Sequence, residues 1–274
     1  MFETVLVAVD GNDTDHASIE LGAMIAERAE ATLCLLHVSP SGQGDDIQRA
    51  IEQRLAGAPG TAKLEVKVGD PAEVIVDEAA ASPAALTCLT SQGRGALGDL
   101  MAGSVTEAVL ATSSTPVVVL GPASSASQIA AGTSVVICVD ESSDCESIVG
   151  PSVELIRTLG VGASLVEVVP PDEQVHIDDV PNVDVSTASG RRRLDEVETM
   201  LRLHGIERIE AHILYGADVA ESVAHFAREH GAAAVAMASH GLSGVRRLLR
   251  GSNTMRLIAI APCPVLTVRC DARE

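Results

Sequence analysis

The sequence predicts two α/β domains in tandem, each built on a parallel β-sheet covered by helices. The chain of 274 residues suits two domains of ordinary size better than one. Short β-branched segments alternate with amphipathic helical segments, and the second half repeats the motifs of the first in the same order. Strand, helix and strand in succession imply a parallel sheet with right-handed crossovers.

The composition fits such a sheet. Only Phe2, Phe226 and Tyr215 are aromatic in a chain that is 46% hydrophobic, so we expect an aliphatic core. A net charge of −19 repels a phosphate backbone and an anionic membrane surface, so neither nucleic acid nor membrane is an expected partner. The sequence shows no membrane span, no signal peptide and no CxxC among six cysteines, which predicts a cytoplasmic protein with reduced thiols. A redox pair of Cys263 and Cys270 is the alternative.

The repeat can be followed along the chain. VLVAVDGNDTD at 5–15 is matched by VVICVDESSDC at 135–145, an offset of 130 residues. SQGRGALGDLMAGSVTEAVL at 91–110 is matched by SHGLSGVRRLLRGSNTMRLI at 239–258, an offset of 148. An insertion of 17 residues in the second half, and one more residue later, account for the difference.

Within each half the elements follow in a fixed order. After the opening strand, HASIELGAMIAERAE at 16–30 has its apolar residues at helical spacing. GDPAE at 69–73, which follows a later strand, reads as a turn and a helix start, with a proline suited to the first turn. TPVVVLG at 115–121 and CPVLTVR at 263–269 close the two halves, and we expect these strands to pair, because their edges need covering.

Two segments are predicted to lie outside the sheets. The stretch at 171–192 is acidic, proline-punctuated and weakly periodic, which indicates a mobile surface loop; a partner-binding arm is the alternative. PASSASQIAAG at 122–132 is small and polar, which predicts a linker that joins the domains without packing. The predicted domains are therefore residues 1–121 and 133–270.

Residues that follow strands are the candidates for ligand binding, because open parallel sheets bind ligands at the carboxyl ends of strands where the strand order reverses. Asp10 and Asp140 end the opening strands of the two halves. Such a carboxylate can accept hydrogen bonds from a ribose hydroxyl or an adenine amine. It can equally cap the following helix, and the sequence leaves both interpretations open.

A glycine-rich loop follows the fourth predicted strand of each half, with nine residues between its two glycines. The loop residues are Gly93, Gly103 and Ser104 in the first half, and Gly241, Gly251 and Ser252 in the second. Glycine lets the backbone approach a phosphate, and the amides of the helix start that follows favour an anion. A single Gly-Ser before a helix can also be an ordinary helix cap. The same Gly-Ser occurs in both halves, which favours the phosphate interpretation.

These motifs resemble those of the universal stress protein family. The V-x-V-D opening strand, the G-x-x-G-9x-G-(S/T) loop and the closing P-V strand cover essentially the whole chain as a tandem pair. SHGLSGVRRLLRGS followed by APCPVLTVR is the most specific segment. The resemblance implies two five-stranded parallel α/β domains of the Rossmann-like, adenine nucleotide alpha hydrolase type. It also implies ATP binding in some members, pairing of domains and further dimerisation in many tandem members.

The family's ATP-contacting positions can be carried over to both halves. They are Asp10, Val38, Thr90, Gly93, Gly103, Ser104 and Val105 in the first half, and Asp140, Val168, Ala238, Gly241, Gly251, Ser252 and Asn253 in the second. Thr90 and Ala238 depart from the family, which has the first loop glycine there, and their Cβ atoms narrow the site. The implied ligand is ATP, with or without Mg²⁺, and no residue is assigned a catalytic or metal-binding role.

Charge distinguishes the two loops. The nine-residue gap carries Arg246, Arg247 and Arg250 in the second half but Arg94 and Asp99 in the first. A triphosphate prefers the more basic gap, so we expect the second half to be the better ATP site. The alternative is that these arginines occupy a solvated helix face.

The expected function is regulatory and not enzymatic: a protein that binds ATP and acts through a homodimer or a partner. A nucleotide-free dimeric scaffold is the first alternative, which Thr90 and Ala238 favour and the two Gly-Ser helix starts oppose. A slow ATPase is the second, although the sequence offers no evident base or nucleophile beyond Asp10 and Asp140. The histidines show no metal-binding spacing, and no GxxxxGK[ST] loop or G-x-S-x-G elbow occurs.

Overall fold

The computed structural model describes residues 1–10, 15–39, 62–91, 105–124, 129, 131–140, 146–169, 185–240 and 252–270. The first half contains β1 (Thr4–Val9), α1 (Asp15–Ala29), β2 (Thr32–Ser39), β3 (Ala62–Val68), α3 (Pro71–Ala81), β4 (Ala85–Thr90), α4 (Val105–Thr112) and β5 (Val117–Leu120). The second half contains β6 (Ser134–Cys138), α6 (Glu146–Leu159), β7 (Gly162–Val169), α7 (Val185–Leu203), β8 (Ile209–Tyr215), α8 (Val219–Glu229), β9 (Ala234–His240), α9 (Ser252–Ile260) and β10 (Val265–Cys270).

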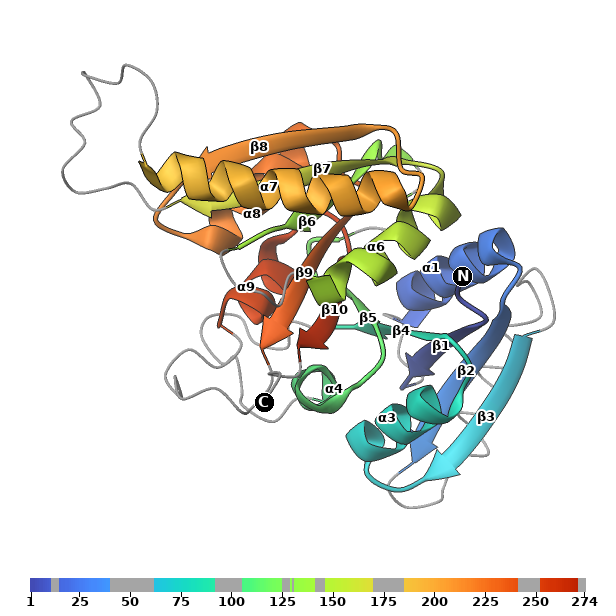
Figure 1. Cartoon of the computed structure of the whole chain (residues 1–274). Helices are drawn as coiled ribbons and strands as arrows, with labels where there is room; N and C mark the ends of the chain where they lie inside the picture. Colours follow the sequence, from blue (N-terminus) through green and yellow to red (C-terminus); the bar gives the residue numbers. More distant parts are fainter. Residues whose placement is uncertain are drawn as a thin grey trace.

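The strands form one ten-stranded sheet of order β3-β2-β1-β4-β5-β10-β9-β6-β7-β8 (Figure 1). All strand pairs within each half are parallel, which confirms the two predicted five-stranded parallel sheets. The closing strands β5 and β10 pair, as predicted, and their pairing is antiparallel, with Leu266 opposite Val118. These two residues are 148 apart, which is the repeat offset, so they are equivalent residues of the two halves. A pseudo-twofold axis therefore passes between them.

Both faces of the sheet are buried, which explains the continuous apolar runs in its strands. Each of the four residues of β5 is at most 2% exposed. Helices α1, α6 and α7 contribute to the core on one face, and α3, α4, α8 and α9 to the core on the other (Figure 1). No helix in the described part of the chain is both long and apolar enough to cross a membrane.

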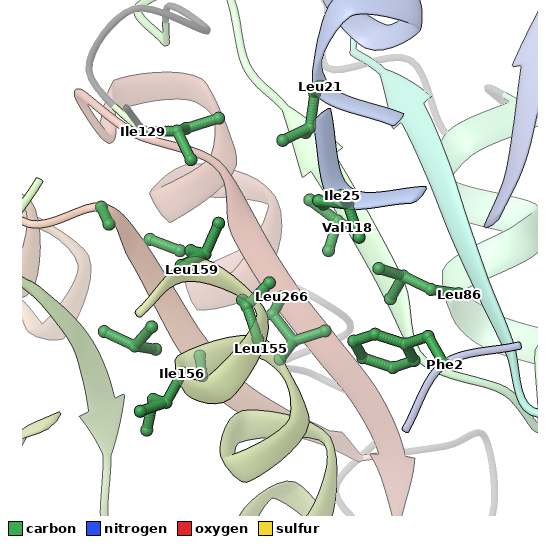
Figure 2. Packing of buried hydrophobic residues seen from close by; sticks show 14 of the residues in the cluster. Phe2, Leu21, Ile25, Leu86, Val118, Ile129, Leu155, Ile156, Leu159 and Leu266 are labelled. Atoms are coloured by element: carbon green, nitrogen blue, oxygen red, sulfur yellow. The ribbon is translucent and has the colours of Figure 1, made fainter. Parts of the chain in front are cut away.

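The core on the α1–α6 face is continuous across the two halves. Figure 2 shows the packing around the β5–β10 junction, where the labelled side chains are Phe2, Leu21, Ile25, Leu86, Val118, Ile129, Leu155, Ile156, Leu159 and Leu266. Helix α1 of the first half packs against α6 of the second. Burial of one such side chain contributes roughly 1.5–3 kcal/mol, so separating the halves would expose a large part of this core.

Two arginines add polar contacts between the halves. Arg28 in α1 donates a hydrogen bond from Nη1 to the carbonyl oxygen of Leu159, the last residue of α6, at 3.1 Å. Arg269 in β10 donates from Nη1 to the carbonyl oxygen of Thr112, the last residue of α4, at 2.9 Å. Each guanidinium thus satisfies a C-terminal carbonyl of a helix from the other half, where a cation also suits the helix dipole.

The linker packs, contrary to expectation. Ile129 is 2% exposed and belongs to the shared core. The hydroxyl of Ser124 lies 3.0 Å from the carbonyl oxygen of Cys263, to which it donates a hydrogen bond. The prediction that 122–132 joins the halves without packing is therefore wrong at these two residues, because one isoleucine among small residues is enough to join the core.

Helix α7 begins inside the stretch expected to be a loop. The last eight residues of 171–192 form its start, whereas the rest of that stretch lies outside the described residues. Exposed ion pairs at i,i+4 spacing, Arg191–Asp195 at 3.7 Å and Arg192–Glu196 at 3.1 Å, lie along the start of the helix. The loop prediction is wrong for these eight residues, because their partners lie beyond the end of the stretch.

Four of the described cysteines form no disulfide, namely Cys34, Cys88, Cys138 and Cys263. Cys263 is therefore not bonded to Cys270, and the alternative of a redox pair is wrong for this structure. Burial raises the pKa of the Cys34 thiol to about 11 and those of Cys88 and Cys263 to about 12, since a thiolate is poorly solvated there.

Candidate functional site

The strand order reverses once in each half. In the order β3-β2-β1-β4-β5, the chain places β2 on one side of β1 and then crosses to place β4 on the other. The same crossover puts β7 and β9 on opposite sides of β6. Open parallel sheets bind ligands at the carboxyl ends of the strands that flank such a reversal. The fold therefore offers one candidate site at the ends of β1 and β4, and a second at the ends of β6 and β9.

The first-half site gathers residues from three strands and a helix. Asp10 directly follows β1 and is exposed, while Thr90 ends β4 and is half-buried. Val38, also half-buried, lies near the end of β2. It lies level with Asp10, because the residues that precede these two, His37 and Val9, pair with each other. Val105 begins α4 and is exposed. Since α4 connects two parallel strands, its N-terminus lies at the same edge.

The second-half site repeats this arrangement. Asp140 follows β6 and is exposed, whereas Val168 in β7 and Ala238 in β9 are half-buried. Ser252 is the first residue of α9, and the exposed Asn253 is the second. The structure thus brings together the predicted residues that it describes in each half.

The glycine-rich loops remain predictions. Their residues Gly93, Gly103, Ser104, Gly241 and Gly251 lie outside the described part of the chain, as do the arginines that distinguish the two gaps. The described part of each site consists of strand ends and a helix start.

The two interpretations of the aspartates depend on segments outside the described residues, which are 11–14 after Asp10 and 141–145 after Asp140. Helix α1 begins at Asp15, five residues after Asp10, and α6 begins at Glu146, six residues after Asp140. An N-cap residue directly precedes the first helical residue. Whether Asp10 and Asp140 cap a helix or meet a ligand therefore stays a prediction, and both residues lie at the carboxyl edge of the sheet.

His37 is a site residue to which the sequence assigned no role. It is 4% exposed, and its Nδ1 lies 2.9 Å from the carbonyl oxygen of Val9. A carbonyl only accepts, so Nδ1 carries the proton and fixes the end of β1 beside Asp10. Nε2 is buried without a hydrogen-bond partner among the described residues. The repeat offset of 130 places Glu167, 5% exposed, at the equivalent position, so each half buries a polar side chain there.

The chemistry of each site suits a ligand with an apolar ring and an anionic group. Partly buried valine and alanine or threonine side chains offer apolar contact, and a carboxylate accepts from hydroxyls or amines. The first turn of α4 or α9 presents backbone amides, which favour an anion. Among the described residues, no group of three or more histidine, cysteine, aspartate and glutamate side chains could hold a metal ion.

Comparison with known proteins agrees with this geometry. The sequence profile of the universal stress protein family matches residues 1–47, 42–121 and 133–269. The chain belongs to the universal stress protein family. Its tandem matches fall on the two halves of the sheet.

Relatives and solved structures extend this result. The protein described as "Universal stress protein in QAH/OAS sulfhydrylase 3′region" from Thermus aquaticus is 36% identical over 83 residues, which cover 29% of this chain and 60% of that protein. The match thus spans less than two thirds of that relative. A universal stress protein from Archaeoglobus fulgidus DSM 4304 has a TM-score of 0.71 at 17% identity, covering 99% of this chain and 97% of its own. A functionally unknown protein from Pseudomonas aeruginosa PAO1 has a TM-score of 0.68 at 13% identity, with 98% and 93% covered. At these identities the two structures show a common fold.

Proposed function

We propose that this universal stress protein is a regulatory protein that binds ATP at the carboxyl edge of its sheet, and that the second half is the better site. The observation that carries the proposal is the repeated arrangement at the two strand-order reversals. In each half an exposed aspartate, a half-buried valine and a helix N-terminus lie at one edge. Such an edge suits the ribose, the base and the phosphates of a nucleotide respectively.

The preference for the second half is supported by two differences in sequence between the halves, one at the first loop position and one in the nine-residue gap. At the place of the first loop glycine, the second half has Ala238 and the first half the larger Thr90. The second-half gap also contains three arginines, Arg246, Arg247 and Arg250. Both differences favour a triphosphate in the second half.

We assign a signalling role to the bound nucleotide: its binding changes the shape or assembly of the protein, and it is not hydrolysed. We place the protein in the cytoplasm, where cysteine thiols stay reduced. Within one chain, β5 and β10 already cover each other. A homodimer, which we also propose, would therefore form through a surface other than these closing strands. A nucleotide-free scaffold is the alternative that Thr90 and Ala238 favour, since their side chains narrow the two sites.

Calorimetric titration of the full-length protein with ATP tests the proposal, with and without Mg²⁺. The Gly251→Ala and Gly103→Ala variants assign the heat to one half, and the intact chain is used because the halves share a core. We expect Gly251→Ala to abolish the tighter binding and Gly103→Ala to leave it. No binding at millimolar ATP would overturn the proposal in favour of the scaffold. Phosphate release above that of an Asp140→Ala variant would show a slow ATPase instead.

A further inference from the structure

In the second half, one arginine joins the N-terminal ends of two helices. Arg256, in the second turn of α9, donates from Nη1 to Oδ2 of Asp218 and from Nη2 to Oε1 of Glu221, the latter at 2.7 Å. Asp218 is itself the N-cap of α8, where its Oδ1 accepts from the amide of Glu221 at 2.9 Å. The guanidinium thus binds a carboxylate that is already held in place by a helix start. We call this set of three residues the Arg256 clamp.

The first half keeps the carboxylates of the clamp but not its arginine. Asp70 caps α3 and accepts from the amides of Ala72 and Glu73 at 3.0 and 3.1 Å, so it is the equivalent of Asp218. Glu73 follows it by three residues, as Glu221 follows Asp218. The repeat offset of 148 places Ala108 of α4 at the position of Arg256. Its methyl group packs against the core and offers no donor.

The clamp lies beside the candidate site of the second half. Helices α8 and α9 pack against each other on the same face of the sheet (Figure 1). Both begin at its carboxyl edge, because each connects two strands of the second half that run in the same direction. Arg256 is four residues from Ser252, so it fixes the turn of α9 whose amides would meet a phosphate. The positive charge of Arg256 also reduces the net negative charge of the clamp to −1, whereas Asp70 and Glu73 of the first half together carry −2.

We infer that Arg256 is a positioning residue that makes the second half the preferred nucleotide site. By tying the start of α9 to the start of α8, it holds the α9 amides in place for a phosphate. By neutralising one of two carboxylates, it removes repulsion that the first half keeps. This inference rests on the proposed function, and it explains the preference from residues outside the glycine-rich loop.

Reciprocal substitutions in the full-length protein test the clamp. Arg256→Met should weaken ATP binding at the second site about tenfold, since charge-assisted hydrogen bonds of this kind are strong enough for such a change. Arg202→Met is the matched control, because it removes an equally exposed arginine, paired with Glu198, from α7 on the other face. It should leave the affinity unchanged.

Placing an arginine at the equivalent position of the first half tests whether Arg256 positions the helix start or has only a structural role. In the Gly251→Ala background, Ala108→Arg should strengthen ATP binding at the first site, whereas Ala108→Met should not. Hydrogen exchange gives a readout without ATP: Arg256→Met should speed exchange of the amides of residues 257 and 258, whose hydrogen bonds close the first turn of α9, and Arg202→Met should not.

The outcomes distinguish the two proposals. If the unmodified protein binds ATP but Arg256→Met binds equally well and exchanges its α9 amides at the same rate, the clamp has no positioning role and the proposed function stands. If Ala108→Arg and Ala108→Met behave alike, the transfer of preference is refuted. If the unmodified protein binds no ATP, the proposed function fails and the inference fails with it.

Discussion

The shared core predicts that the two halves unfold as one unit. Leu155 of α6 is 2% exposed and Ile25 of α1 is fully buried, and both lie at the junction shown in Figure 2. Truncating either to alanine should cost about 2–5 kcal/mol, from lost burial and the cavity left behind. For a chain of this size that lowers the melting temperature by roughly 4–20 °C.

Two probes make the assay specific. Circular dichroism follows both halves, whereas tyrosine fluorescence follows only the second, because the chain has no tryptophan and a single tyrosine, Tyr215. We expect the two urea transitions to coincide in the unmodified protein, in Leu155→Ala and in Ile25→Ala. Leu203→Ala is the control: Leu203 is 82% exposed, and its truncation should change the stability by no more than about 0.5 kcal/mol.

The decisive comparison is between the two core variants. The reasoning would be refuted if Ile25→Ala shifted only the dichroism transition and left the Tyr215 transition in place. That result would mean that the halves are separately stable and that the junction contributes little.

Three further predictions concern single positions. Gly121→Ala should destabilise the protein by about 3 kcal/mol or more in urea unfolding, because an added Cβ would lie 1.7 Å from the carbonyl oxygen of Ile258. Ser124→Ala should cost about 1–2 kcal/mol in the same assay, since it removes the hydroxyl that bonds across the halves. The thiols of Cys88 and Cys263 should resist alkylation at pH 8 until the protein unfolds. Their pKa rises on folding from 9.0 to about 12, so stability should fall as pH increases above 9.0, where only the unfolded thiols lose protons.

The fold was predictable because the strands between the two edge strands, β3 and β8, are largely buried. A strand such as Val117–Leu120 reads as an uninterrupted apolar run, and its edge has to be covered, which predicted the pairing with Val265–Cys270. Ile129 was missed because nothing in its neighbourhood marks one isoleucine as part of a core. The start of α7 was missed because the ion-pair partners and the described buried residues of this helix come after residue 192, outside the stretch 171–192.

From the strand pattern alone, the site was predictable only for residues that come at the end of a strand. Asp10 and Asp140 could be placed at the sheet edge from the strand pattern, although the sequence left open whether they cap a helix. His37 could not be assigned a role, because its partner is a backbone carbonyl 28 residues away. The contact of Arg256 with Asp218 spans 38 residues and two helices, and no local spacing announces it.

The contact of Arg269 with the end of α4 has a consequence for how the two halves can diverge. The residue equivalent to Arg269 by the repeat offset is Gly121, where even a methyl group would collide with the Ile258 carbonyl. In a symmetric dimer of identical subunits, each interface residue occurs twice in the same surroundings. An arginine on one side and an obligatory glycine on the other would be incompatible with that requirement. Joining the copies in one chain allows each side of the junction to acquire its own residues, so the pair can hold two unlike sites.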